Sequence, residues 1–337
     1  MGRSVSDLIV FVLKRLALLI PVLVGIIILT FVFTHISVVD PCPIWYPHAG
    51  KTTLANCEAQ FRQPIVDQFF VYFGNLLKGN WGASQQGVLV YPTIISAVPA
   101  TIELVFASLF LMIVIGIPLG VIAAQYAGRW GDHLVRIFYL SGWATPTYLG
   151  AVIAAVFIAP ALGLPARGEY TTTPPPFPQY THMSVIDALI AGNVPYTLDA
   201  ISHLVLPATV LAFINMGIAT RMTRSSMLEV LPLDYVKSAR MKGLSEFWVM
   251  YKHALRNALI TTTTVMGVTA GGLFSGTVVV EEVFAWPGIG AYAFNAITAP
   301  NFDGAIAVVA VFAIGVVIAN LVADILYGVL DPRVDWR

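Results

Sequence analysis

The sequence predicts an all-α membrane protein with six transmembrane helices. Of its 337 residues, 58% are hydrophobic and 11% are charged, and the mean hydropathy is +0.80, whereas soluble domains carry about 25% charged residues. Six apolar segments are long enough to cross a bilayer, which takes about 20 residues. The basic residues concentrate in alternate connecting segments. The formal net charge is zero, so no overall field indicates a nucleic-acid partner.

The predicted spans follow the apolar runs in chain order. The first run is long enough to span and is followed by no convincing small-residue cleavage site, so we expect a retained helix and not a signal peptide. The spans are expected at 16–36, 104–126, 137–164, 204–220, 259–280 and 305–323, the last with a continuation to 330.

The orientation follows from the basic residues. If the N-terminus is cytoplasmic, the outer segments hold only Lys51, Arg62, Lys78 and Arg167, and the inner segments hold all the other Lys and Arg residues. The positive-inside rule therefore predicts that both termini are cytoplasmic. The resulting organisation is an N-terminal transmembrane helix at 1–37, an external segment at 38–100, a core of five transmembrane helices at 101–330 with a cytoplasmic loop at 221–256, and a cytoplasmic tail at 331–337.

The loop at 221–256 is the only long polar and basic interval of the chain, and it predicts two helices joined by a glycine turn. Asp234 follows Pro232 and is expected to be the N-cap of a short helix at about 235–242. Gly243 suits the left-handed residue that ends such a helix. Ser245 can then start a second helix.

The short helix has two distinct edges, because residues three and four apart share a face. The small-residue edge is Val236, Ala239 and Gly243, and the basic edge is Lys237, Arg240 and Lys242. We expect the flat, small-residue edge to dock into a groove on another protein.

The residues of this loop carry a specific resemblance. The run 234–244, DYVKSARMKGL, resembles the cytoplasmic EAA-type loop of ABC-importer permeases, with Ser238-Ala239-Arg240 at the EAA position and Gly243 as its glycine. The flanks at 221–231 and 253–258 resemble the dipeptide/oligopeptide permease family in particular. One departure is Leu259, where that family usually carries a proline. The resemblance extends from about residue 93 to the C-terminus, and more loosely to the first helix.

The resemblance implies a type I ABC-importer permease fold with an external segment between helices 1 and 2. It implies a subunit that forms half of a pathway for di- or oligopeptides, together with a homologous second permease, two cytoplasmic ABC ATPase subunits and an external substrate-binding protein. ATP and Mg²⁺ would be bound by the partner ATPases, and this chain would bind no cofactor. The residues implied in ATPase coupling are Asp234, Tyr235, Ser238, Ala239, Arg240, Lys242 and Gly243.

Other functions stay open at this point. Relatives in the same family carry oligosaccharides or nickel. A self-contained secondary transporter or channel tends to show internal repeats, broken helices and intramembrane ion ligands, and we detect no repeat and few such ligands. A membrane-embedded enzyme is disfavoured because the sequence has no phosphate-binding loop, no H-E-x-x-H and no G-x-S-x-G in a strand-to-helix context.

The external segment holds the two cysteines, Cys42 and Cys57. On the oxidising side of a membrane they are expected to form a disulfide that closes a loop of about 15 residues and adds roughly 3 kcal/mol of stability. The alternative is two free thiols. Farther along, 63–72 is expected to form a short interfacial helix, and the proline- and threonine-rich loop at 165–202 is expected to be an extended external lid, docking rim or spacer.

The acidic residues in or near the spans are candidates for a specific role, since intramembrane acids are functional or structurally paired. Glu103, Glu281 and Glu282 are expected near the outer surface, within reach of water, and Glu281 and Glu282 precede a Trp-Pro-Gly turn that resembles a second family signature. Asp324 lies deeper in the last span. Its expected partner is a backbone group, a hydroxyl, Arg333 or another subunit.

Glycines and hydroxyls mark the expected close contacts. Gly116 and Gly120 flank Pro118 and favour tight helix packing over a hinge. The glycines at 267, 271, 272 and 276 predict that the fifth span is the most tightly packed. The segment 141–148 resembles the family's Ser-x-Pro segment, and its hydroxyls could line a pathway or bond to their own helix.

Overall fold

The computed structural model describes residues 5–36, 59, 62–82, 88–173, 175–298 and 302–330. In these ranges the regular elements are helices, some with π-helical turns (η). The elements are α1 (Val5–Ile36), α4 (Ile65–Leu77), α5 (Val90–Leu111), η1 (Met112–Gly116), α6 (Ile117–Gln125), α7 (Trp130–Ala144), α8 (Thr147–Ile153), η2 (Ala154–Ile158), α9 (Ala159–Leu162), α10 (Ser184–Ile190), α11 (Val194–Val230), α12 (Asp234–Met241), α13 (Glu246–Trp248), η3 (Val249–Ala254), α14 (Leu255–Val283), α15 (Ile289–Thr298) and α16 (Phe302–Leu330).

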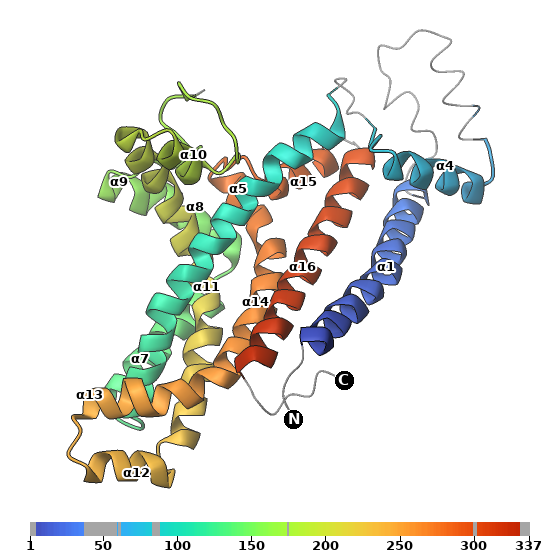
Figure 1. Cartoon of the computed structure of the whole chain (residues 1–337). Coiled ribbons are helices and arrows are strands. Elements are labelled where there is room, and N and C mark those ends of the chain that lie inside the picture. The colour runs from blue at the N-terminus through green and yellow to red at the C-terminus, as the bar shows by residue number, and fades with distance from the viewer. Residues whose placement is uncertain are drawn as a thin grey trace.

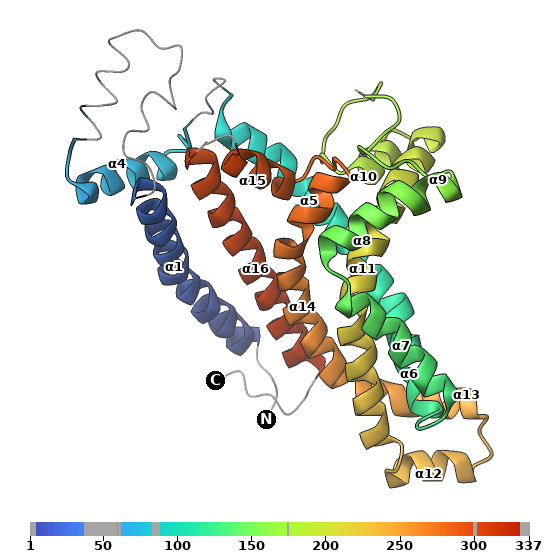
Figure 2. The same ribbon diagram turned by 180° about the vertical axis from the view of Figure 1, so that it is seen from behind.

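The long helices run between two ends of the molecule. In both views α5, α11, α14 and α16 extend along its length, with α4, α9, α10 and α15 gathered at one end and α12 and α13 at the other (Figures 1 and 2). A continuous helical stretch such as Val90–Gln125, with 36 residues, is about 54 Å long at 1.5 Å per residue. Because the hydrocarbon core of a bilayer is about 30 Å thick, these helices also reach beyond it.

The described residues hold four helices long and apolar enough to span a membrane, or five if a bent pair counts as one span. The four are Val90–Gln125, Val194–Val230, Glu246–Val283 and Gly304–Val322. The predicted first span at 16–36 falls within α1. The apolar part of α1 whose side chains the structure describes, Ile20–Val32, is shorter than a membrane span. The all-helical fold is therefore confirmed, and the described part supports four or five of the six predicted spans.

The predicted third span, 137–164, is wrong as one continuous helix. Two helices, Trp130–Ala144 and Thr147–Leu162, meet there at a bend of 103°. The bend follows from Pro146, since a proline disfavours helical geometry in the residue before it, and Thr145 is extended with ψ of 120°. Ser141 Oγ and Thr145 Oγ1 donate to carbonyls of their own helix, Phe138 O and Ser141 O, each at 2.7 Å.

The outer ends of two spans begin earlier than the apolar runs indicated. The second begins at Val90 and the fourth at Val194, 14 and 10 residues before the predicted starts at 104 and 204. The predicted loop at 165–202 therefore contains α10 and the start of α11. The short helix expected at 63–72 is confirmed as α4. Cys42 and Cys57 lie outside the described residues.

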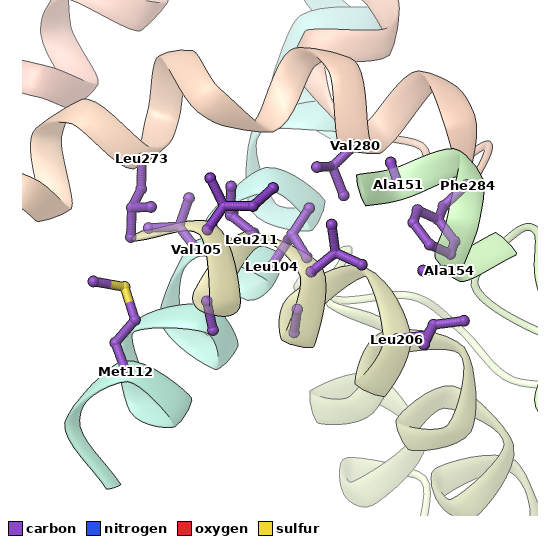
Figure 3. Packing of buried hydrophobic residues seen from close by; sticks show 14 of the residues in the cluster. Leu104, Val105, Met112, Ala151, Ala154, Leu206, Leu211, Leu273, Val280 and Phe284 are labelled. Carbon is purple, nitrogen blue, oxygen red and sulfur yellow. The ribbon is translucent and has the colours of Figure 1, made fainter. Parts of the chain in front are cut away.

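The main apolar core surrounds α11, which packs against α5, α6, α7 and α14. Figure 3 shows Leu104 and Val105 of α5, Leu211 of α11 and Leu273 of α14 converging on one another. Alanines such as Ala151 and Ala154 complete the packing and let the helices approach closely. The core thus packs the middle of α11, from Leu206 to Ala219, against its neighbours.

The closest helix approaches involve glycines outside the fifth span. A Cβ at Gly120 would lie 2.6 Å from Thr223 Cβ and 2.7 Å from the Thr220 carbonyl oxygen, and a Cβ at Gly142 would overlap the Phe213 carbonyl. The expectation of tight packing around Pro118 is therefore confirmed. In the fifth span a Cβ at Gly271 would come no closer than 3.3 Å to another atom, and one at Gly272 would meet nothing within 4 Å. The prediction that this span is the most tightly packed is wrong, because it rested on spacing and not on what faces each glycine.

Gly120→Ala and Gly272→Ala form a matched pair of substitutions. Both gain up to about 1 kcal/mol of helix propensity, but only Gly120→Ala forces a methyl group against backbone and side-chain atoms of α11, at a cost of about 1–3 kcal/mol. We expect a lower unfolding temperature for Gly120→Ala and an unchanged or higher one for Gly272→Ala in detergent-solubilised protein. Equal shifts in the two variants would contradict the close approach of α6 and α11.

Candidate functional site

The most distinctive feature of the chain is the α12–α13 hairpin, residues 231–254, at the end of the molecule opposite α10 and α15 (Figure 1). The predicted N-cap role of Asp234 is wrong. Leu233 has the extended backbone of an N-cap, with φ of −70° and ψ of 148°, and Asp234 is the first helical residue. Its almost fully exposed carboxylate accepts from Lys237 Nζ at 3.1 Å. An acid at this position still interacts favourably with the helix dipole.

The turn of the hairpin has the predicted geometry. Gly243 has φ of +75°, in the left-handed region that favours glycine. Ser245 has an extended backbone and precedes α13. Arg240 then joins the two arms, since its Nη2 and Nε donate to the Glu246 carboxylate at 2.8 and 3.2 Å. The turn and this ion pair together fix how α13 leaves α12.

Two residues of the small-residue edge of α12, Val236 and Ala239, face the interior of this chain, whereas Gly243 is exposed. Val236 is fully buried and Ala239 is 5% exposed. They belong to an apolar cluster, here called the hairpin core, with Val121, Ala124, Met227, Val249, Met250, Ala254, Leu255 and Ala258. The expectation that Ala239 faces a partner is therefore wrong. An eight-residue helix with few contacts of its own needs this apolar edge to attach it to α6, α11 and α14.

The opposite side of the hairpin is open. Met241 is 80% exposed and Phe247 is 62% exposed, although both are apolar. The other exposed residues of this surface are Asp234, Tyr235, Lys237, Arg240, Lys242, Gly243, Leu244 and Trp248, and Ser238 is half-buried. Tyr235 is also tied to the chain, since its hydroxyl accepts from Asn257 Nδ2 at 2.7 Å. Exposed apolar side chains among basic ones are typical of a protein-binding surface.

At the other end of the molecule, Glu281 is completely buried. Its carboxylate accepts from Thr101 Oγ1 and Gly290 N, both at 2.7 Å, and from Ala291 N at 3.1 Å. Thr101 Oγ1 in turn accepts from Ile289 N at 2.9 Å. The Glu281 side chain thereby fixes the turn between α14 and α15 against α5.

Glu103 is also buried and belongs to a second junction. It accepts from Ser184 N at 2.8 Å, Ser184 Oγ at 2.9 Å and Val185 N at 2.9 Å, at the start of α10. The expectation that Glu103 and Glu281 are within reach of water is wrong, because the start of α10 and the α14–α15 turn cover them. Asp324 lies in α16, and its side chain is outside the described part.

Sequence reasoning missed the partners of these carboxylates. Trp286 Nε1 donates to the Ala100 carbonyl at 2.9 Å and Trp286 N donates to the Glu281 carbonyl at 2.8 Å, so Trp286, Thr101 and Glu281 form one connected network. In the sequence, the Trp-Pro-Gly segment indicated the turn that contains Trp286. Thr101 carried no signal, since only the fold brings it to within reach of a residue 180 positions away.

Glu281→Gln tests this network, and Glu282→Gln at the adjacent position, outside the network, is its control. Glu281→Gln weakens acceptance from three donors and leaves buried groups poorly satisfied, at a cost of about 1–3 kcal/mol. Glu282 is half-buried, and its substitution is expected to change stability by no more than about 0.5 kcal/mol. Thermal unfolding and proteolysis within 284–290 provide the measurements. A similar small effect from both variants would argue against the network.

Glu169, in the outer loop at 165–202, has a carboxyl group whose pKa is raised. Burial raises the pKa of its carboxyl to about 7, and the negative charges of Glu103 and Asp187 add to that rise. A carboxyl with a higher pKa in the folded than in the unfolded state binds more protons when folded. The usual pKa of a glutamate carboxyl is 4.5, and that of Glu169 in the folded chain is about 7. As the pH rises through this interval, Glu169 therefore lowers the free energy of unfolding.

Glu169→Gln should remove this part of the pH dependence. We expect the wild-type unfolding temperature to fall more between pH 5 and pH 8 than that of Glu169→Gln. The measurement is thermal unfolding across that pH range in one detergent. Parallel curves for the two proteins would contradict the raised pKa.

The described residues contain no group of three or more His, Cys, Asp or Glu side chains that could hold a metal ion. The fold and the hairpin define a class of protein: a helical membrane protein that exposes apolar and basic side chains together at one end.

Comparison with known proteins identifies the family. Residues 116–336 match the model of the binding-protein-dependent transport system inner membrane component. The chain is 38% identical over 94% of its length to the probable D,D-dipeptide transport system permease protein DdpB of Escherichia coli (strain K12), of which it covers 94%. It is 37% identical over 96% of its length to the dipeptide transport system permease protein DppB of Haemophilus influenzae, of which it covers 98%. The chain belongs to this family of transport components.

A solved structure supports the same fold. The MetNI methionine ABC transporter, crystallised in inward-facing conformations, matches with a TM-score of 0.50 at 16% identity, covering 77% of this chain and 98% of the other. The chain is thus an inner-membrane permease component with multiple membrane-spanning helices, and not a catalytic subunit. A binding-protein-dependent system of this type implies ATPase and binding-protein partners.

Proposed function

We propose that this chain forms half of the membrane pathway of an ATP-driven importer for di- or oligopeptides. The support for peptides comes from relatives whose names specify dipeptide or oligopeptide transport, among them the oligopeptide permease AppB of Bacillus subtilis, 33% identical over 97% of this chain. The other half would be a homologous permease, and an external binding protein would deliver the peptide. Two cytoplasmic ATPase subunits would bind ATP and Mg²⁺.

The proposed membrane topology has six spans, a type I importer fold and cytoplasmic termini. The predicted first span lies in the 32-residue helix α1 and adds to the four or five spans of the described part. The bias of basic residues toward one side supports the orientation. With this orientation the α12–α13 hairpin lies in the cytoplasm, where ATPase subunits would meet it.

The observation that carries the proposal is that the hairpin is buried on one side and exposed on the other. Its inner edge is packed into the chain through Val236 and Ala239, whereas Met241, Lys237 and Lys242 project outward. An element fixed on one side and open on the other can transmit a displacement imposed by a partner. We therefore assign ATPase docking to this exposed surface, and the buried edge holds the helix in place. The coupling role includes Asp234, Tyr235, Ser238 and Arg240, with Gly243 setting the turn.

Met241→Glu tests the docking surface, with Lys14→Glu as the matched control. Both positions are exposed and both variants place a glutamate there, but Lys14 belongs to α1, a helix that Figure 1 shows on the other side of the molecule from the hairpin. A buried, unpaired charge in an interface is costly, so we expect Met241→Glu to lose at least about 10-fold in ATPase-subunit retention and in uptake of a labelled dipeptide. The assays use vesicles containing the whole complex. Wild-type behaviour of Met241→Glu would overturn the proposal.

Ala239→Trp distinguishes the buried edge from the docking surface. Overpacking the hairpin core should cost about 1–3 kcal/mol and lower the unfolding temperature of the isolated chain, whereas Met241→Glu should leave that temperature nearly unchanged. An Ala239→Trp chain that unfolds like wild type but no longer retains the ATPase subunits would return Ala239 to the partner-facing side.

A further inference from the structure

An ion pair between a buried carboxylate, Asp132, and a partly exposed guanidinium, Arg224, joins α7 to α11 near the hairpin end of the molecule. Asp132, in the first turn of α7, has no exposed surface. Arg224 of α11 donates to both of its oxygens, from Nε to Oδ1 at 2.8 Å and from Nη2 to Oδ2 at 2.7 Å. Gly128 N donates to Oδ2 at 3.0 Å, and Arg136 Nε lies 3.3 Å from Oδ1. The bidentate geometry fixes the distance and the direction between the two helices.

Arg224 is placed on the part of α11 that leads directly into the hairpin. Met227, three residues later, is buried in the hairpin core with Val236 and Ala239. Val121 and Ala124 of α6 belong to the same cluster, and Gly120 of α6 packs against Thr223. Both helices that flank the turn between α6 and α7 therefore contact α11: α6 by apolar packing and α7 by the ion pair.

The other end of α7 is the 103° bend before α8. From Trp130 to Ala144 the helix has 15 residues, about 22 Å at 1.5 Å per residue. A helix transmits a displacement along its axis because its hydrogen-bonded backbone is stiff. Much of the α7 surface is exposed, with Leu134 at 61% and Ile137 at 62%. Two charged contacts join α7 to α11: the ion pair at the hairpin end, and the Arg221 guanidinium over the Trp143 ring, 5.3 Å from the ring centroid, toward the bend.

Stability alone does not account for this pair. A buried ion pair is on average no more stabilising than a well-packed apolar pair of the same volume, because desolvation offsets the attraction. What the pair adds is a fixed register between α7 and α11. We propose that Asp132 and Arg224 are positioning residues that make α7 move together with the α12–α13 hairpin, so that a displacement of the hairpin reaches the bend at Pro146. This inference rests on the proposed function of the hairpin.

The test compares Arg224→Met and Arg224→Lys with Arg136→Gln. Arg224→Met removes the two-point charged contact and leaves the Gly142–Phe213 packing of the two helices in place, and Arg224→Lys keeps a charge but not the two-point geometry. Arg136 also lies beside Asp132, but it belongs to α7 itself and cannot join α7 to another helix. In vesicles with the complete complex, we expect stimulation of ATPase activity by the peptide-loaded binding protein to fall about 10-fold in Arg224→Met, a size typical of coupling between sites. Arg224→Lys should be intermediate, and Arg136→Gln should equal wild type.

A distance measurement separates positioning from a merely structural role. Spin labels at Leu134→Cys on α7 and Glu229→Cys on α11, both exposed positions, report the register of the two helices in a chain with Cys42 and Cys57 replaced by serine. With Arg224 present, we expect one narrow distance that is equal in the nucleotide-free and ATP-trapped complexes. In Arg224→Met we expect a broader or nucleotide-dependent distance.

The outcomes distinguish this inference from the proposed function. Arg224→Met complexes that retain their ATPase subunits but lose stimulation and the fixed distance support the inference. Normal stimulation with a fixed distance in Arg224→Met overturns it and leaves hairpin docking intact. A wild-type Met241→Glu complex, in contrast, would reject the docking surface itself. If Arg224→Met does not fold, the Arg224→Lys protein decides, since wild-type stimulation and an unchanged distance in that variant overturn the inference.

Discussion

A carboxylate removed from water must find its donors within the chain, and this constraint explains how the spans of this permease are joined at both ends. Glu281 collects a hydroxyl and two backbone N–H groups at the α14–α15 turn. Glu103 does the same at the start of α10, and Asp132 holds α7 to α11. Leaving any of these groups unpaired would cost far more than an ordinary surface contact. Each therefore connects elements distant in sequence, at places where a helix end needs a defined position.

Between these junctions the helices are held by small residues and shape. Gly120 and Gly142 allow two other helices to approach α11, and alanines fill the narrow space around Leu211 and Leu273. Without a hydrophobic driving force between helices in lipid, close packing and internal hydrogen bonds provide the attraction. The α11 helix is therefore the central element, since it carries the contacts of the core, the ion pair and the entry into the hairpin.

The α12–α13 hairpin combines two requirements that are usually separated. Its inner edge is as buried as the transmembrane core, and its outer surface exposes both apolar and basic side chains. A short helix can be rigid only if it is packed, and it can bind a partner only if one side stays free. Met227 of the hairpin core follows Arg224 by three residues, so the hairpin core and the Asp132–Arg224 pair are both attached to the last turns of α11.

The sequence alone determined the helical class, the approximate positions of the apolar spans, the glycine turn at Gly243 and the family, because these depend on local composition, period and motif. It could not determine which edge of α12 is buried, since Val236 and Ala239 could equally face the chain or a partner until α6 and α14 were placed beside them. It also misjudged Asp234, because Leu233 takes the cap position, and it treated residues 137–164 as one helix although Pro146 bends the chain. The partners of Glu103, Glu281 and Asp132 lie 81, 180 and 92 residues away in sequence. Only the tertiary structure decided those contacts, because the same carboxylates would face water if the distant segments did not fold over them.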